Sequence, residues 1–176
     1  MTVCENSIRE KKAAIFRKRA LKLAAVAEEE AGEWVDIVEF MLGGERYGLE
    51  FSFVEEVFPS FEITPLPCAP SFLSGVVNLR GRIVPVVDLK IVFKIPDRGA
   101  TRPGVIVMTD GKGEMGFLAD EITGIDRIRR EDLHPPLSAA TGGASAYAAG
   151  ICGEDLTVLD GEKILENRGL IVDEEP

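Results

Sequence analysis

The sequence predicts an all-β fold of two similar β subdomains, preceded by a helical extension. Three observations support this prediction. Short apolar runs follow Trp34, and Gly- and Pro-containing breaks separate them, a pattern typical of barrels and sandwiches. Three short landmarks recur in the same order later in the chain, which indicates a repeated structural unit. Residues 1–33 differ in composition and precede both patterns.

Residues 8–31 predict the helical extension, because they are rich in Ala, Leu, Lys, Arg and Glu, with no Pro or Gly before Gly32. Seven basic residues and one acid, Glu10, lie between Arg9 and Lys22. A basic helix with a weak apolar stripe can lie on a membrane or bind an acidic partner. A solvated extension that frays is the other interpretation, and the sequence leaves both open.

The apolar runs predict the strands, since short apolar runs bounded by turn residues are typical of strands. They cover residues 35–42, 46–51, 53–58, 73–79, 82–87, 104–109, 114–119, 121–128, 147–152 and 155–160. The Pro-containing segments between them predict loops at 65–70, 96–103 and 135–145. Asp88 is expected to cap a short helix over residues 89–93.

An internal repeat supports the two-subdomain prediction. The matched landmarks are Tyr47-Gly48-Leu49 with Met115-Gly116-Phe117 (offset 68), Gly75 with Gly150 (offset 75), and Val86-Val87-Asp88 with Val158-Leu159-Asp160 (offset 72). Because they recur in the same order, we expect one domain over residues 34–168. Its two subdomains would cover about 34–95 and 103–165, with boundaries that can interleave. An acidic tail follows at 169–176.

Residues 71–89 are the most informative stretch for function. Arg80 lies between two strand-like runs, and Gly81 beside it has the backbone freedom that a tight reversal needs. A long charged side chain at a hairpin tip is well placed to contact another protein, although many exposed arginines only solubilise a turn. The matching hairpin around residues 153–155 is shorter and acidic. The two tips have therefore diverged while the strand pattern has persisted.

The charge distribution argues against a nucleic-acid partner. The chain has a net charge of −10, and residues 34–176 carry 24 acidic and 13 basic residues. An acidic body repels the phosphate backbone of nucleic acids. No apolar run reaches the length of a membrane span, and no apolar signal core lies near the N-terminus. We therefore expect no direct membrane insertion and a cytoplasmic location.

Residues suited to catalysis or metal binding are few. The cysteines Cys4, Cys68 and Cys152 are isolated, and His134 is the only histidine, so neither a four-ligand zinc site nor a Cys–His nucleophile is expected. Isolated cysteines suit a reducing compartment, and Cys68 is expected to pack as a small apolar residue. Gly111-Lys112-Gly113 is a glycine-rich segment that lacks the spacing of a P-loop and fits a hairpin turn, and the serine-hydrolase elbow is missing from the sequence.

Adjacent acidic residues are the remaining candidates for chemistry. Neighbouring residues in a strand point to opposite faces, so we expect such pairs to be solvated rather than to converge on one site. The pairs are Glu55 with Glu56, Asp120 with Glu121, and Glu131 with Asp132. The sequence thus predicts a protein that is not an enzyme and that holds no cofactor and no metal.

Four segments within residues 34–168 together resemble the CheW family of chemotaxis coupling proteins. They are residues 40–57, 65–89, 105–120 and 147–165. The most specific part is Asn78-Leu79-Arg80-Gly81 followed by Pro85-Val86-Val87-Asp88-Leu89. The resemblance implies a fold of two SH3-like five-stranded β-barrels packed side by side, which agrees with the internal repeat.

The resemblance also implies a function, that of a non-enzymatic adaptor between chemoreceptor cytoplasmic tips and the histidine kinase CheA, located at membrane receptor arrays. In the family, a groove between the barrels holds the receptor tip. Barrel ends meet the CheW-like regulatory domain of the kinase and build rings. Carried over by motif, Arg80 is the first candidate for a receptor-facing residue, and Phe51, Val54, Glu56 and Val57 would line the groove. Val54 and Val57 could equally be barrel core.

Other assignments stay open from the sequence. Gly75, Asn78 and Gly81 are expected to shape the hairpin rather than to contact a partner. The helix over residues 8–31 is not part of the family's core pattern. A second hypothesis places the scaffold in a non-flagellar chemosensory pathway, such as type IV pilus motility, with this helix docking a distinct partner. A third, a small enzyme or metabolite-binding barrel, requires a pocket with converging polar groups.

Overall fold

The computed structural model describes residues 32–59, 61–100, 102–136, 142–167 and 170. The chain divides into two units between Glu33 and Trp34, and the fold described below is that of the second unit. The helix predicted over residues 8–31 lies outside the described residues, as does the acidic tail apart from Leu170. No helix in the described ranges is both long and apolar enough to cross a membrane.

The described part of the chain is mostly strands, as the sequence predicts. The strands are β1 (Trp34–Leu42), β2 (Glu45–Glu50), β3 (Val54–Phe58), β4 (Leu73–Leu79), β5 (Arg82–Val87), β6 (Gly104–Thr109), β7 (Glu114–Ala119), β8 (Glu121–Arg129), β9 (Leu133–His134), β10 (Ala148–Cys152) and β11 (Leu156–Leu159). Every predicted strand is present, with its ends shifted by at most one residue. The apolar runs do not predict β9, which is two residues long.

Short helices and 3-10 turns connect the strands. They are α2 (Leu89–Phe93), α3 (Gly161–Glu166), η1 (Phe51–Phe53), η2 (Arg130–Asp132) and η3 (Gly142–Tyr147). The Asp88 side chain accepts a hydrogen bond from the backbone N–H of Lys90 at 2.9 Å, which confirms the predicted cap of α2. Asp160, its counterpart in the repeat, caps α3 through the N–H of Lys163 at 3.2 Å.

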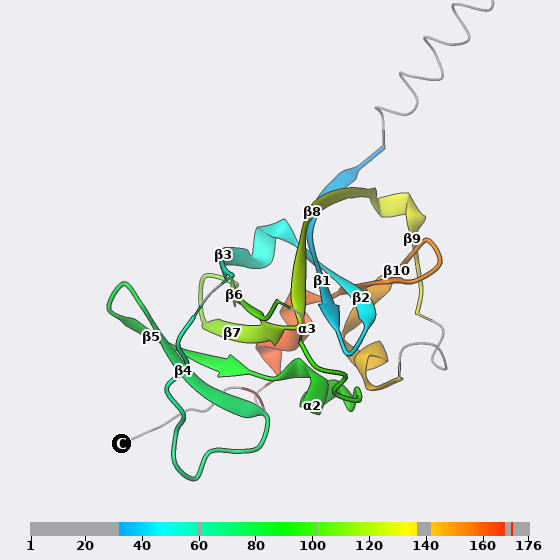
Figure 1. The fold of residues 1–176 in the computed structure, drawn as a ribbon. Coiled ribbons are helices and arrows are strands. Elements are labelled where there is room, and N and C mark those ends of the chain that lie inside the picture. Colours follow the sequence, from blue (N-terminus) through cyan, green and yellow to red (C-terminus); the bar gives the residue numbers. More distant parts are fainter. Residues whose placement is uncertain (1–31, 60, 101, 137–141, 168–169, 171–176) are drawn as a thin grey trace, which may run out of the picture. The chain divides into compact units, whose positions relative to one another are not determined.

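The strands form two sheets (Figure 1). Sheet A has the order β8-β1-β2-β11-β10-β9, and sheet B has the order β3-β6-β7-β5-β4. Sheet B has the predicted five strands, whereas sheet A has six, because β9 adds to its edge by pairing His134 with Ile151. At the matching position of sheet B, a single bridge joins Thr64 to Val76.

Neither sheet is built from one half of the chain. Sheet A combines β1 and β2 with β8 to β11, and sheet B combines β3 to β5 with β6 and β7. The exchange is reciprocal. Gly48 in β2 pairs in parallel with Val158 in β11, and its repeat counterpart Gly116 in β7 pairs in parallel with Val86 in β5. A division of the chain near residues 95–103 therefore does not separate the sheets.

Buried apolar side chains join the two sheets into one body. A central core takes residues from both sheets, and each sheet also encloses a smaller inner core of its own. In strand β6, successive side chains point to opposite faces of the sheet and therefore enter different cores. Val105 and Val107 lie in the inner core of sheet B, while Ile106 and Met108 lie in the central core. A strand buried on both faces thus belongs to two cores at once.

The environments of Cys68 and Asp120 differ from those expected from the sequence. Cys68 does not pack as a small apolar residue but is exposed with a φ of 62°, because the Pro-rich loop that carries it lies on the surface. Asp120 is not solvated but is 5% exposed. It lies between β7 of sheet B and β8 of sheet A, where its carboxylate accepts hydrogen bonds from Lys90 Nζ at 2.7 Å and from the N–H of Gly43 at 2.6 Å.

Candidate functional site

The β4–β5 hairpin carries Arg80 at its tip and extends to the left of sheet B in Figure 1. Leu79 pairs with Arg82, so the loop consists of Arg80 and Gly81. Both have positive φ, 51° and 91°, as a two-residue type I′ turn requires. Asn78 supports the turn, because its Oδ1 accepts a hydrogen bond from the N–H of Gly81 at 2.9 Å. The tip is therefore a short, well-defined reversal.

Gly75 lies at the base of the same hairpin, where the register of β4 against β5 shifts. Its φ is 142°, and a Cβ there would overlap the carbonyl oxygen of Thr64. Thr64 and Val76 exchange two backbone hydrogen bonds of 2.9 Å beside it. Because Gly75 has no side chain, the backbone at Thr64 can approach β4 and hold the base of the hairpin.

Ion pairs link the hairpin to β3. Arg80 Nη2 donates to Glu56 Oε1 at 2.7 Å, and Arg82 donates to Glu55 at 2.7 Å and to Glu114 at 2.6 Å. The hydrogen bond from Arg82 lowers the pKa of Glu55, and the same bond together with Glu114 raises the pKa of Arg82. Strand β3 is an edge of sheet B, so these contacts join the β4–β5 hairpin to that edge and to β7.

Glu55 and Glu56 both reach this pair of arginines although they are adjacent in β3. Val54 pairs with Met108, and Glu56 pairs with Val107, so Glu55 is the additional residue of a β-bulge. The bulge breaks the alternation of side chains along the strand. The expectation that adjacent acids do not converge is therefore wrong for this pair.

The five residues predicted to face the receptor have different environments. Arg80 and Glu56 contact each other, with side chains 82% and 28% exposed. Phe51 is 48% exposed and lies in the 3-10 turn η1 rather than on a strand. Val54 and Val57 are half-buried and pack against the central core.

Arg82, Glu55 and Glu114 belong to the same charged cluster, although the sequence did not single them out for this role. The spacing of Arg80 and Arg82 on either side of Gly81 is a local signal that could have drawn attention to Arg82. No local signal places Glu114 beside it, since 32 positions separate the two residues. Only the parallel pairing of β5 with β7 brings them together.

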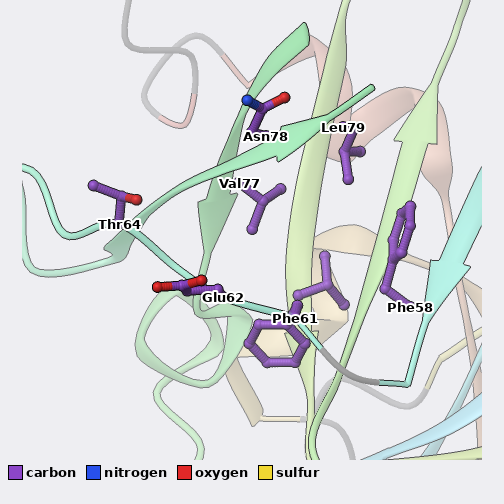
Figure 2. A pocket seen from close by; sticks show the side chains of 8 residues that line it. Phe58, Phe61, Glu62, Thr64, Val77, Asn78 and Leu79 are labelled. Carbon is purple, nitrogen blue, oxygen red and sulfur yellow. The ribbon is translucent and has the colours of Figure 1, made fainter. Parts of the chain in front are cut away.

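A pocket of about 280 Å³ opens between the end of β3 and β4 (Figure 2). Figure 2 shows Val77 and Leu79 pointing toward it, while Asn78 points to the other face of β4. Among the described residues that line it, Glu62 is the one charged side chain. A single carboxylate supplies fewer oxygen ligands than a bound cation usually takes. The described residues also hold no group of three His, Cys, Asp or Glu suited to a metal ion.

The described part of the chain thus combines interleaved β-sheets with an exposed arginine on a tight hairpin, beside a pocket lined by both apolar and polar side chains. An exposed arginine on a tight turn is suited to a contact with another protein. A family model described as the CheW-like domain matches residues 36–169. The chain therefore belongs to the CheW family, whose members are non-enzymatic scaffold proteins of chemotaxis signalling, and the resemblance inferred from the motifs is confirmed.

Individual relatives agree with this assignment. Chemotaxis protein CheW of Treponema pallidum is 29% identical over 148 residues, covering 78% of this chain and 86% of that protein. The protein of the same name from Klebsiella aerogenes is 32% identical over 151 residues, with coverages of 81% and 90%. The crystal structure of scaffolding protein TtCheW from Thermoanaerobacter tengcongensis is 31% identical with a TM-score of 0.66, covering 72% of this chain and 84% of that one. It confirms the two-subdomain β fold.

Proposed function

We propose that this chain is an adaptor that couples the cytoplasmic tips of chemoreceptors to the regulatory domain of the histidine kinase CheA. Family membership supports the general role. The observation that carries the proposal is the tip of the β4–β5 hairpin, where the family's Asn-Leu-Arg-Gly motif presents an Arg80 side chain that is 82% exposed. We assign this tip to the receptor and place the protein in the cytoplasm at membrane receptor arrays.

The proposed receptor surface combines exposed and supporting residues. Arg80 and Glu56 supply charge, and the half-exposed ring of Phe51 supplies apolar area. Val54 and Val57 support β3 from the central core. A helical receptor tip that lays its apolar side against such a surface would be aligned by charges at the rim. To transfer a signal, the contacts between adaptor and receptor must also differ between two signalling states. Each contact can be weak, because many copies act together in an array.

The charge of Arg80 provides the test of this proposal. A titration with a soluble receptor-tip fragment and with the kinase regulatory domain would compare wild type with Arg80→Glu. We expect Arg80→Glu to weaken receptor binding about tenfold or more, a change of about 1.4 kcal/mol, because an attraction at the rim becomes a repulsion. Binding to the kinase domain should stay within about twofold of wild type.

Arg127→Glu is the matched control, since Arg127 is an exposed arginine on sheet A that pairs with Asp36 at 2.6 Å. We expect it to leave receptor binding unchanged. If wild type binds neither fragment, the adaptor function is wrong. If Arg80→Glu and Arg127→Glu weaken receptor binding equally, the assignment of the hairpin tip is wrong.

One relative favours an alternative in which the protein serves a different chemosensory pathway. Protein FrzA of Myxococcus xanthus is 37% identical over 98 residues, covering 55% of this chain and 61% of that protein. The same scaffold would then serve a chemosensory pathway other than flagellar chemotaxis, such as type IV pilus motility, with residues 8–31 as the docking segment for a distinct partner. Deleting the gene and measuring swimming and surface motility separately would distinguish the two circuits.

A further inference from the structure

The pocket between the end of β3 and β4 lies at an edge of sheet B that is only partly paired. Within the described ranges, the outer side of β4 has one pairing contact, the bridge between Thr64 and Val76. The pocket lies beyond this bridge, against residues 77–79. We propose that it is a docking site for an extended segment of a partner protein. The segment adds to β4 as a short strand and inserts an apolar side chain into the pocket.

The course of the chain before the bridge leaves this edge open. Figure 2 shows the segment from Thr64 back to Phe61 running away from β4, with Val77 and Leu79 pointing into the space between them. The pocket there has a volume of about 280 Å³, which is enough for one aliphatic side chain. The chain itself therefore leaves the place beside residues 77–79 of β4 to another segment.

Sheet A shows that this fold accepts a short strand at such an edge. Cys152 of β10, the repeat counterpart of Val77 at an offset of 75, pairs with Leu133 of β9. Leu133 and Cys152 both pack against the inner core of sheet A. In sheet B the described pairing ends at Val76, one residue before Val77. A partner strand would thus extend the pairing of sheet B, as β9 does in sheet A.

The main chain of Asn78 provides the hydrogen bonds for a docked strand. Val76 exchanges two backbone hydrogen bonds of 2.9 Å with Thr64 on the outer side of β4. Main-chain groups of an antiparallel strand point to the same side at every second residue, so the N–H and C=O of Asn78 point outward as well. No residue of the described segments pairs with Asn78 on that side. Unpaired groups at a strand edge are a template for strand addition.

The lining of the pocket indicates the chemistry of the partner segment. Most of the described lining side chains are apolar, and they are Phe58, Phe61, Val77, Leu79 and Val105. The exposed Glu62 is the one charged side chain among them. Its carboxylate attracts a cation at the mouth of the pocket. The expected segment therefore carries an aliphatic residue next to Lys or Arg.

NMR titration of the isotope-labelled full chain with capped synthetic peptides tests this site. The probe has a central valine, a lysine on each side of it and a threonine at each end, because Val and Thr favour extended chains. We expect it to shift the backbone amide resonance of Asn78 in a saturable manner. A peptide with glutamates in place of the lysines should bind about fivefold more weakly or less. A peptide N-methylated at both lysines cannot donate the main-chain N–H opposite Asn78, and it should not bind.

Glu62→Lys tests the charge at the mouth of the pocket and should weaken binding of the lysine peptide about fivefold. Glu154→Lys is the matched control, since Glu154 is an exposed acid on the β10–β11 hairpin of sheet A and the change in net charge is the same. We expect this control to bind the peptide as wild type does.

Three results would overturn the inference. A wild-type protein without a saturable shift at Asn78 has no docking site at this edge. Equal weakening by Glu62→Lys and Glu154→Lys would show that the peptide is attracted to the acidic chain in general, whose net charge is −10. Binding of the N-methylated peptide with unchanged affinity would show that no strand is added to β4. The inference does not depend on the role proposed for Arg80.

Discussion

Gly75 shows how a single residue can decide the geometry of the candidate site. Its φ of 142° and the close approach of Thr64 leave no room for a Cβ. The bridge between Thr64 and Val76 depends on this approach, and it holds the base of the hairpin that carries Arg80. Gly150, the repeat counterpart, is likewise next to a pairing contact, because β9 pairs with Ile151.

Gly75→Ala tests whether the absence of a side chain at this position is required for the close approach of Thr64. Gly124 is the matched control, since its φ of 149° is similar but no other atom lies near its Cβ position. Gly124→Ala should cost only the backbone strain, about 1–3 kcal/mol. Gly75→Ala should cost about 2 kcal/mol more, because two backbone hydrogen bonds of the bridge are also disturbed. Urea unfolding followed by circular dichroism measures both, and equal costs would contradict the steric argument.

At the scale of elements, the two hairpins of the repeat show reversed charges. In sheet B, Arg82 of the β4–β5 hairpin pairs with Glu114 at the start of β7. In sheet A, Asp155 of the β10–β11 hairpin pairs with Arg46 at the second residue of β2, at 2.8 Å. Arg46 and Glu114 lie at matching positions of the repeat, 68 residues apart. The duplicated framework thus presents a basic tip on one sheet and an acidic tip on the other.

The β4–β5 hairpin provides a prediction at this scale. Arg80→Asn creates Asn-Gly, the pair that type I′ turns favour, at the cost of an exposed ion pair worth about 0.2–1 kcal/mol. We expect the free energy of unfolding to equal that of wild type or to exceed it by up to about 1 kcal/mol, while receptor binding is lost. Urea unfolding and the fragment titration measure the two effects. A loss of stability of about 1 kcal/mol or more would show that the arginine serves the turn itself.

At the scale of the whole molecule, a buried charge cluster lies where the chain passes from sheet B to sheet A. Asp120 binds Lys90 of α2 and Gly43 of the β1–β2 turn, and Lys90 also binds Asp97 at 2.8 Å. Burial acts to lower the pKa of Lys90, but the hydrogen bonds to Asp120 and Asp97 outweigh it and raise the pKa to about 12. The cluster thus fixes segments of both sheets to one another.

Lys90→Met should destabilise the protein by about 3 kcal/mol, because it leaves the Asp120 carboxylate buried without its cation. Lys163→Met is the matched control, since Lys163 is half-exposed and pairs with Asp160 at 3.0 Å, and it should cost about 1 kcal/mol or less. Chemical unfolding measures both. If the two variants are equally stable, the cluster does not hold the sheets together.

The stability difference between wild type and Lys90→Met should depend on pH. The folded-state pKa of Lys90 is raised from 10.5 to about 12, so its contribution to stability is fully present below pH 10.5. The contribution is then lost as the pH rises toward 12. The difference in unfolding free energy between wild type and Lys90→Met should therefore be constant near neutral pH and shrink above pH 10.5. A difference that grows above pH 10.5 would contradict the sign of the shift.

Much of this structure could be predicted from local patterns alone. Apolar runs placed the ten predicted strands, because each strand must bury side chains whatever it pairs with. Asp88 before Leu89 predicts the cap of α2, and Arg80 beside Gly81 predicts the tight turn. Both predictions are possible because caps and turns depend on a few neighbouring residues. The exposed Arg80 and its hairpin therefore followed from the sequence.

The remaining features depend on contacts between distant parts of the chain. The reciprocal exchange of strands between the halves places Glu114 beside Arg82, and the bulge at Glu55 turns two adjacent acids toward the same arginines. Asp120 looked like a solvated acid because its partners, Lys90 and Gly43, are 30 and 77 positions away. Which strands pair is decided by burial summed over both sheets, a quantity that no local pattern contains.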